Sequence, residues 1–317
     1  MTDTQNEVFK TPVNKIRLFE HGAPGSQNLK LTRKYYTEDM PDGRVKHIVQ
    51  NIIDPDIVPY IPDGIGNSTD RQRIPAVLII PGGAFRRLVY NFEGEDVAKW
   101  LNSMGIAAFV LECRLPSDEH DNAEDVPLID AMRAMRVIRG RAQEFGIDEA
   151  KIGVMGFSAG GFMAALLSTA YESDVYADYK YKDEYDKLSA RPDFAVCSYP
   201  VISIDDCIEA GKRYMSEEQV LERISDSKAK ILHKYNPDKL VRPDMPPVFI
   251  CETDDDRTTL SENSVGFYMA ARKAGVSAEL HIFRTGGHGY GCGDDFAQTG
   301  EWKVLFTKWI KSIGIIS

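Results

Sequence analysis

Short, mostly apolar segments alternate with segments of helical spacing along most of this 317-residue chain. Apolar runs of strand length are typical of β-strands buried on both faces, as in a parallel sheet covered by helices. We therefore expect β-strands at residues 75–80, 107–111, 152–155, 194–196, 248–250 and 278–283.

Segments with helical spacing follow several of these runs. We expect helices at residues 94–104, 126–145, 161–171 and 304–313. Strands that alternate with helices indicate an α/β fold with helices on both faces of one sheet. The pattern predicts a mostly parallel central sheet of about eight strands.

The region before residue 62 has a different pattern, in which short β-prone segments are separated by proline and glycine turns. Such spacing is typical of antiparallel strands. We expect these strands at one edge of the sheet, at residues 29–36, 45–52 and 57–61.

Two polar stretches, residues 173–188 and 204–242, interrupt the alternation later in the chain. The second is helical in pattern, and Ser216 with Gln219 predicts a capping box. We expect a single domain over residues 1–317, with residues 204–242 as a lid over the carboxyl edge of the sheet. A surface excursion without a role is the alternative interpretation.

Composition and charge exclude several classes of function. The net charge of −10 disfavours nucleic acids and anionic membranes as partners. No apolar run approaches the roughly 18 residues of a membrane span, and the polar N-terminus lacks the pattern of a signal peptide. The five cysteines show neither a CxxC pair nor a zinc spacing. We expect a cytoplasmic protein without metal or cofactor.

The sequence Gly-Phe-Ser-Ala-Gly at residues 156–160 carries the first chemical signal. It lies between an expected strand and an expected helix, which is the context of a nucleophile elbow. Small residues allow the sharp turn, and the helix N-terminus favours negative charge at the serine. This pattern predicts Ser158 as a catalytic nucleophile, the alternative being a plain strand-to-helix turn.

A serine nucleophile needs a base, and histidine is suited because its pKa lies near neutrality. His288 follows the last expected strand, within a glycine-rich loop, and precedes the closing helix. The order serine, acid, histidine is that of an α/β-hydrolase, so His288 is the expected base. The acid is expected in the run Asp254, Asp255, Asp256, after the strand at 248–250.

A tetrahedral oxyanion requires backbone N–H donors. Ala159, directly after the nucleophile, is one expected donor. The second is expected from Gly83 or Ala84, in the Pro-Gly-Gly-Ala-Phe loop after the strand at 75–80. A turn without a catalytic role is the alternative for this loop.

Together these segments resemble α/β-hydrolase esterases of the acetyl-xylan esterase and feruloyl esterase-like group, which are relatives of the acetyl esterase/lipase family. The most specific similarity is at residues 153–161. Further similarities are at residues 21–25, 80–85, 130–134, 146–148, 191–194, 198–203 and 262–264.

The resemblance implies the α/β-hydrolase fold and a choice of acid. The family pattern places the acid first in an Asp-Asp pair, at a set distance before Glu-Asn-Ser, which implies Asp255. The proline that usually follows is absent, and Asp-Asp-Arg is also found in related serine peptidases. Asp254 and Asp256 stay the alternatives.

The implied function is a serine esterase for short acyl groups, with acetyl groups on sugars or oligosaccharides first. The alternatives are a feruloyl or cinnamoyl esterase, an aminopeptidase-like hydrolase, and a non-catalytic binding module on a hydrolase scaffold. The expected partner is a small-molecule ester, and a homo-oligomer is compatible with this reading.

Overall fold

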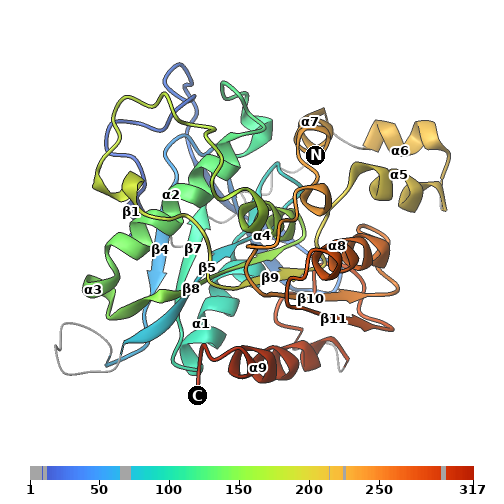
Figure 1. Ribbon diagram of the computed structural model, residues 1–317. Helices are drawn as coiled ribbons and strands as arrows, with labels where there is room; N and C mark the ends of the chain where they lie inside the picture. The colour runs from blue at the N-terminus through green and yellow to red at the C-terminus, as the bar shows by residue number, and fades with distance from the viewer. Residues whose placement is uncertain (1–8, 10–12, 65–72, 214, 224–225, 294–297) are drawn as a thin grey trace.

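The computed structural model describes residues 9, 13–64, 73–213, 215–223, 226–293 and 298–317 of the chain (Figure 1). Its main feature is an eight-stranded sheet with the order β1-β4-β7-β5-β8-β9-β10-β11. The strands are β1 (Ile16–Arg17), β4 (Asp56–Tyr60), β5 (Ile74–Ile80), β7 (Ala107–Glu112), β8 (Ile147–Phe157), β9 (Ala195–Ser198), β10 (Val248–Thr253) and β11 (Ala278–Phe283).

All strand pairs from β7 to β11 are parallel, and only β1 and β4 run antiparallel to their neighbours. The central strands β7 and β10 are buried at every position. Strands with solvent on neither face need apolar residues throughout, which is why the sequence pattern located them. The predicted mostly parallel sheet is confirmed.

Helices cover both faces of the sheet. On one face α1 (Asp96–Ser103) and α9 (Trp302–Ser312) pack together, with the Trp100 and Trp302 rings 4.9 Å apart. The other face carries α2 (Val126–Gly140), α4 (Ala159–Ala170) and α8 (Ser261–Lys273), and α3 (Ala142–Phe145) follows α2 (Figure 1).

Strands β2 (Lys34–Asp39) and β3 (Val45–Gln50) do not lie at the edge of the main sheet, so this part of the prediction is wrong. They form a separate antiparallel sheet with β6 (Leu88–Val89). The Asn91 side chain secures this pairing, because it donates to the Val45 carbonyl and accepts from the His47 N–H. Only β4 of the three expected strands joins the main sheet.

Helix α8 was not expected from the sequence. Its buried positions include the polar residues Asn263 and Ser264, whereas Val265 and Met269 are exposed. The other two buried positions are the apolar Phe267 and Ala271, so polar and apolar residues are mixed on the buried face and the hydrophobic periodicity of α8 is weak.

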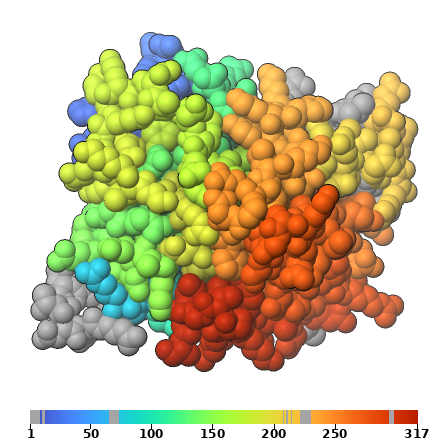
Figure 2. Space-filling model, in the orientation of Figure 1, coloured from blue at the N-terminus to red at the C-terminus, as the bar shows by residue number. Residues whose placement is uncertain are grey.

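The stretch at 204–242 contains α5 (Ile204–Lys212), α6 (Glu217–Arg223), α7 (Asp226–Lys234) and the short helix η4 (Pro237–Lys239). The capping box is confirmed, since Ser216 and Gln219 exchange side-chain and backbone hydrogen bonds. Helix α5 follows the carboxyl end of β9, and α5 and α6 extend to one side of the sheet (Figure 1 and Figure 2). The lid role of this stretch stays a prediction.

The remaining short helices are η1 (Asn91–Glu95), η2 (Pro116–Asp118), η3 (Glu184–Lys187) and η5 (Thr299–Glu301). Among the helices of the described residues, none is long and apolar enough to cross a bilayer.

Candidate active site

Ser158 lies at the tip of a sharp turn between β8 and α4, as the motif predicts. Its backbone has φ of 53° and ψ of −118°, a conformation that L-residues rarely adopt. The turn demands glycine on both sides. A Cβ on Gly156 would lie 1.9 Å from the Gly160 carbonyl oxygen, and a Cβ on Gly160 would lie 1.9 Å from the Ile80 oxygen. The backbone can therefore pack closely enough to form the elbow only because Gly156 and Gly160 have no side chain.

His288 lies next to Ser158, although 130 residues separate them in the sequence. Its Nε2 atom is 2.9 Å from Ser158 Oγ. The loop that carries it follows β11, at the same carboxyl edge of the sheet from which the elbow projects. Parallel strands bring their carboxyl ends to one edge, which explains how distant residues meet here.

The carboxylate beside His288 belongs to Asp256, and the expectation of Asp255 at this position is wrong. Asp256 Oδ2 is 2.6 Å from His288 Nδ1, and Asp256 is 1% exposed. Asp255 is exposed, and its Oδ1 accepts hydrogen bonds from the Gly286 and Gly287 amides. Asp254 is also exposed.

The turn after β10 explains this choice among three adjacent acids. The Asp256 N–H donates to the Thr253 carbonyl, which folds the chain back so that Asp256 points inward. Its carboxylate also accepts from the Thr258 and Thr259 amides at 2.7 and 3.0 Å and from the Thr259 hydroxyl at 2.9 Å. Asp255 instead stabilises the loop that carries His288.

The hydrogen bonds around Asp256 keep it ionised. Burial raises the pKa of a carboxyl group, but the contact with His288 and the two threonine amides outweigh burial and lower the pKa of Asp256. An ionised carboxylate accepts a hydrogen bond from the N–H at His288 Nδ1, so Nε2 is left as the acceptor that faces Ser158. This is the tautomer that a general base requires.

The loop after β5 lies against the nucleophile. A Cβ on Gly82 would be 2.9 Å from Ser158 Cβ. The N–H of Gly82 donates to Glu93 Oε2 at 2.8 Å, so it is already used. Gly83, Ala84 and Phe85 all have positive φ, of 138°, 57° and 61°. The expected donors Gly83 and Ala84 thus follow directly after Gly82, which lies against Ser158. The other expected donor, Ala159, is the first residue of α4.

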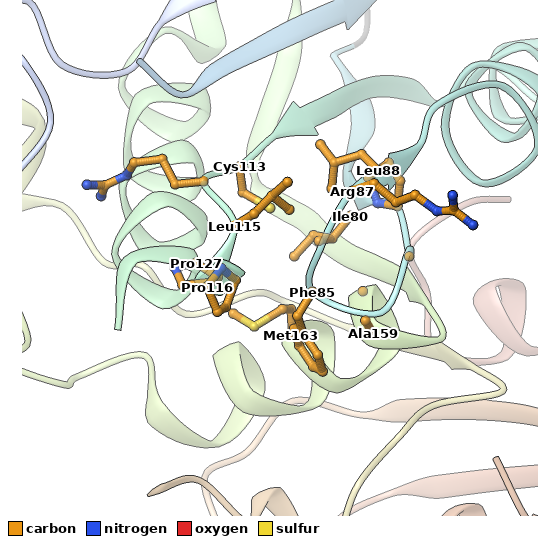
Figure 3. Close-up of a pocket in the computed structure, with 14 residues that line it drawn as sticks. Ile80, Phe85, Arg87, Leu88, Cys113, Leu115, Pro116, Pro127, Ala159 and Met163 are labelled. Atoms are coloured by element: carbon orange, nitrogen blue, oxygen red, sulfur yellow. The ribbon is translucent and has the colours of Figure 1, made fainter. Parts of the chain in front are cut away.

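A small apolar pocket lies behind this loop (Figure 3). Its volume is about 20 Å³, which is room for about one water-sized group. In Figure 3, Phe85 and Met163 lie on one side of it, and Leu115 and Cys113 on the other. The lining residues are Ile80, Pro81, Gly82, Phe85, Arg87, Leu88, Cys113, Arg114, Leu115, Pro116, Pro127, Ala159, Gly160 and Met163.

Sequence reasoning missed the role of two residues in this region. The Thr259 hydroxyl contacts both Asp256 Oδ2 and, at 3.2 Å, His288 Nδ1. Glu93 is 4% exposed, and its carboxylate binds the loop after β5. Glu93 stands among other polar and acidic residues, Asn91, Glu95 and Asp96, so no signal in the sequence singled it out. Within the described ranges, no three His, Cys, Asp or Glu side chains are grouped to hold a metal ion.

The sequence of the chain is similar to those of known proteins. It matches the BD-FAE family over residues 65–270. An acetylxylan esterase of Xylanibacter ruminicola is 31% identical over 240 residues, which are 75% of this chain and 45% of that protein. The endo-1,4-beta-xylanase B of Butyrivibrio fibrisolvens is 31% identical over 71% of this chain and 34% of that protein. The chain thus spans less than half the length of either relative.

Solved structures are similar over nearly the whole chain. An acetyl ester-xyloside bifunctional hydrolase from Caldicellulosiruptor lactoaceticus is 34% identical with a TM-score of 0.73, and the match covers 96% of this chain and 98% of that one. A carboxylesterase from Lactobacillus plantarum has a TM-score of 0.66 at 20% identity, over 90% and 99% of the two chains, which shows the fold alone. The family match includes the elbow, the loop after β5 and Asp256, and the chain belongs to the BD-FAE family and has the α/β-hydrolase fold.

Proposed function

We propose that this chain is a serine esterase that hydrolyses short-chain carboxylic esters through Ser158, His288 and Asp256. The single observation that carries the proposal is the continuous contact from Ser158 Oγ to His288 Nε2 and from His288 Nδ1 to Asp256. Membership of the BD-FAE family and the esterases among its relatives support a carboxylic ester hydrolase.

In the proposed mechanism, Ser158 Oγ attacks the ester carbonyl carbon while His288 Nε2 takes the hydroxyl proton. The N–H groups of Ala159 and of Gly83 or Ala84 stabilise the oxyanion of the tetrahedral intermediate. His288 then gives its proton to the departing alcohol oxygen, which leaves an acyl group on Ser158. Water attacks this acyl-enzyme with His288 again as base, and the carboxylic acid is released.

Asp256 has two roles in this scheme. It holds the Nδ1–H tautomer of His288, and its negative charge stabilises the imidazolium that forms in each step. Because it is buried and bound by three further donors, its position changes little as His288 changes charge. Asp255 has a supporting role through the loop amides that it binds.

The proposed substrate is an acetyl ester of a sugar or oligosaccharide. Two observations favour a short acyl group. The pocket behind the loop is small, with a volume of about 20 Å³, and the similar proteins named above include an acetylxylan esterase and an acetyl ester-xyloside bifunctional hydrolase. We infer that the methyl end of the acyl group occupies this pocket.

The test is hydrolysis of p-nitrophenyl acetate by the wild type and by Ser158→Ala. We expect turnover by the wild type, labelling of Ser158 by a fluorophosphonate, and loss of both in the variant. A series with butyrate, octanoate and ferulate esters and a peptide amide should give the highest kcat/KM for acetate. Wild-type turnover by Ser158→Ala would overturn the mechanism. A preference for ferulate or for the amide would reassign the substrate.

A further inference from the structure

One buried carboxylate beside the site has no part in the mechanism above. Glu93 lies in η1, a short π-helical turn between β6 and α1, and it is 4% exposed. Burial raises the pKa of this group, and nearby His288 opposes the rise. A buried carboxylate is destabilising unless donors satisfy it, so its partners indicate why it is there.

Its first partner is the loop that is expected to hold the oxyanion. Glu93 Oε2 accepts the N–H of Gly82 at 2.8 Å. Gly82 in turn lies directly against Ser158, with its missing Cβ 2.9 Å from the serine Cβ. The hydrogen bond therefore fixes the start of the loop relative to the nucleophile and leaves the following two amides, of Gly83 and Ala84, as the donors.

Its second partner leads to the loop that carries His288. Tyr199 donates its hydroxyl proton to Glu93 Oε1 at 2.9 Å, and the same hydroxyl accepts the N–H of Gly291 at 3.0 Å. The Tyr199 ring also packs edge-to-face on His288, with the ring centroids 5.0 Å apart. Glu93 thus reaches the base through one tyrosine.

We propose that Glu93 is a positioning residue that connects the oxyanion loop to the His288 loop, so that N–H donors, nucleophile and base keep one geometry. The inference rests on the proposed esterase function. Glu93 accepts from both sides at once, because each of its two carboxyl oxygens takes one of the two hydrogen bonds. A buried group whose hydrogen bonds are satisfied on both sides holds both donors in place, which suits a connection between two loops.

The substitution that tests this is Glu93→Gln. Glutamine keeps one acceptor oxygen but presents an NH₂ group to the second donor, so one of the two connections is lost. Donors that stabilise only the transition state affect kcat rather than KM. We expect kcat on p-nitrophenyl acetate to fall about 10-fold in Glu93→Gln and about 100-fold in Glu93→Ala, with KM within about twofold of the wild type.

Tyr199→Phe is the second variant, and Glu95→Gln is the matched control. Phenylalanine keeps the ring on His288 but removes the hydroxyl, so kcat should again fall about 10-fold. The double variant Glu93→Gln/Tyr199→Phe should lose less than the product of the single losses, because both remove one shared connection. Glu95 lies in the same turn but pairs with Lys99 at the surface, so its variant should keep the wild-type kcat.

Thermal unfolding and circular dichroism accompany the kinetics, so that only folded variants are compared. If Glu93→Gln does not fold, Tyr199→Phe decides the question. An unchanged kcat in a folded Glu93→Gln or Tyr199→Phe, with an active wild type, would overturn the connection and leave the esterase proposal intact. A rise in KM with unchanged kcat would also overturn it. A wild type without esterase activity would overturn both proposals.

Discussion

At the scale of single residues, the catalytic serine of the proposed site, Ser158, has a strained backbone conformation. Its positive φ is unfavourable for a residue with a side chain, and the backbone around the flanking Gly156 and Gly160 is closely packed. Its N–H donates to the Ser198 carbonyl on the neighbouring strand, which anchors the turn to the sheet. At the same scale, the direction of one side chain decides which of three adjacent acids can serve His288.

The aspartates give a prediction at this scale. Asp256→Asn should lower kcat by about 10³-fold or more, because the amide no longer holds the imidazole tautomer or stabilises the imidazolium. Asp255→Asn keeps an acceptor oxygen for the Gly286 and Gly287 amides, so its loss should stay within about 10-fold. Initial rates on p-nitrophenyl acetate check the ranking, and a larger loss in Asp255→Asn would contradict the observed geometry.

Between elements, close packing of backbone on backbone builds the site. Helix α4 begins one residue after the nucleophile and approaches β5 so closely that Gly160 touches the Ile80 carbonyl. Helix α8 is held differently. Besides its buried Phe267 and Ala271, its Asn263 side chain accepts from the Ile202 and Ser203 amides, so a polar contact attaches α8 to the chain after β9.

Two glycine substitutions test the close packing of backbone at the elbow, one at a packed position and one at an exposed position. Gly160→Ala should destabilise the protein by at least about 2 kcal/mol, because the new Cβ would overlap the Ile80 oxygen and force the elbow apart. Gly266→Ala, on the exposed side of α8, should stabilise it by about 0.5–1 kcal/mol, because alanine favours the helix and no heavy atom lies within 4 Å. Urea unfolding measures both, and equal effects would refute the packing argument.

For the whole molecule, buried charged groups fasten the N-terminal segment to the α/β core. Arg114 and Asp130 are both buried and form an ion pair at 2.6 Å. Arg114 also donates to the Ser26 hydroxyl, which contacts His120 Nδ1 at 3.1 Å. Burial and the neighbouring positive charge of Arg114 lower the pKa of His120 from 6.5 to about 4. His120 is therefore neutral in the folded protein at neutral pH.

This arrangement predicts how stability depends on pH. Because the pKa of His120 is lower in the folded state, its contribution is present above pH 6.5 and is lost as the pH falls toward 4. Between pH 7 and pH 5 the wild type should lose about 2 kcal/mol through this group. His120→Gln should lose correspondingly less, whereas His21→Gln, at an exposed histidine, should follow the wild type. Urea unfolding at both pH values measures this, and parallel losses in wild type and His120→Gln would exclude the effect.

Local patterns in the sequence were sufficient to predict most of the main sheet and the position of the nucleophile. The apolar runs located the strands of the parallel sheet, and the five residues at 156–160 located the elbow, because each depends on neighbours within one strand, turn and helix. The order of nucleophile, acid cluster and His288 along the chain also predicted that they meet, because parallel strands place the loops after their carboxyl ends at one edge of the sheet.

Three features depended on contacts that no local pattern encodes. The acid is Asp256 because one turn hydrogen bond points it inward, while its neighbour Asp255 points to loop amides. Strands β2 and β3 lie outside the main sheet, because β3 pairs with β6, beyond the loop after β5, and β2 pairs with β3. Glu93 reaches Gly82 and Tyr199 across 11 and 106 residues of sequence. Such contacts arise only when the packed chain brings distant backbone and side chains within hydrogen-bond distance, because burial then requires that each polar group find a partner.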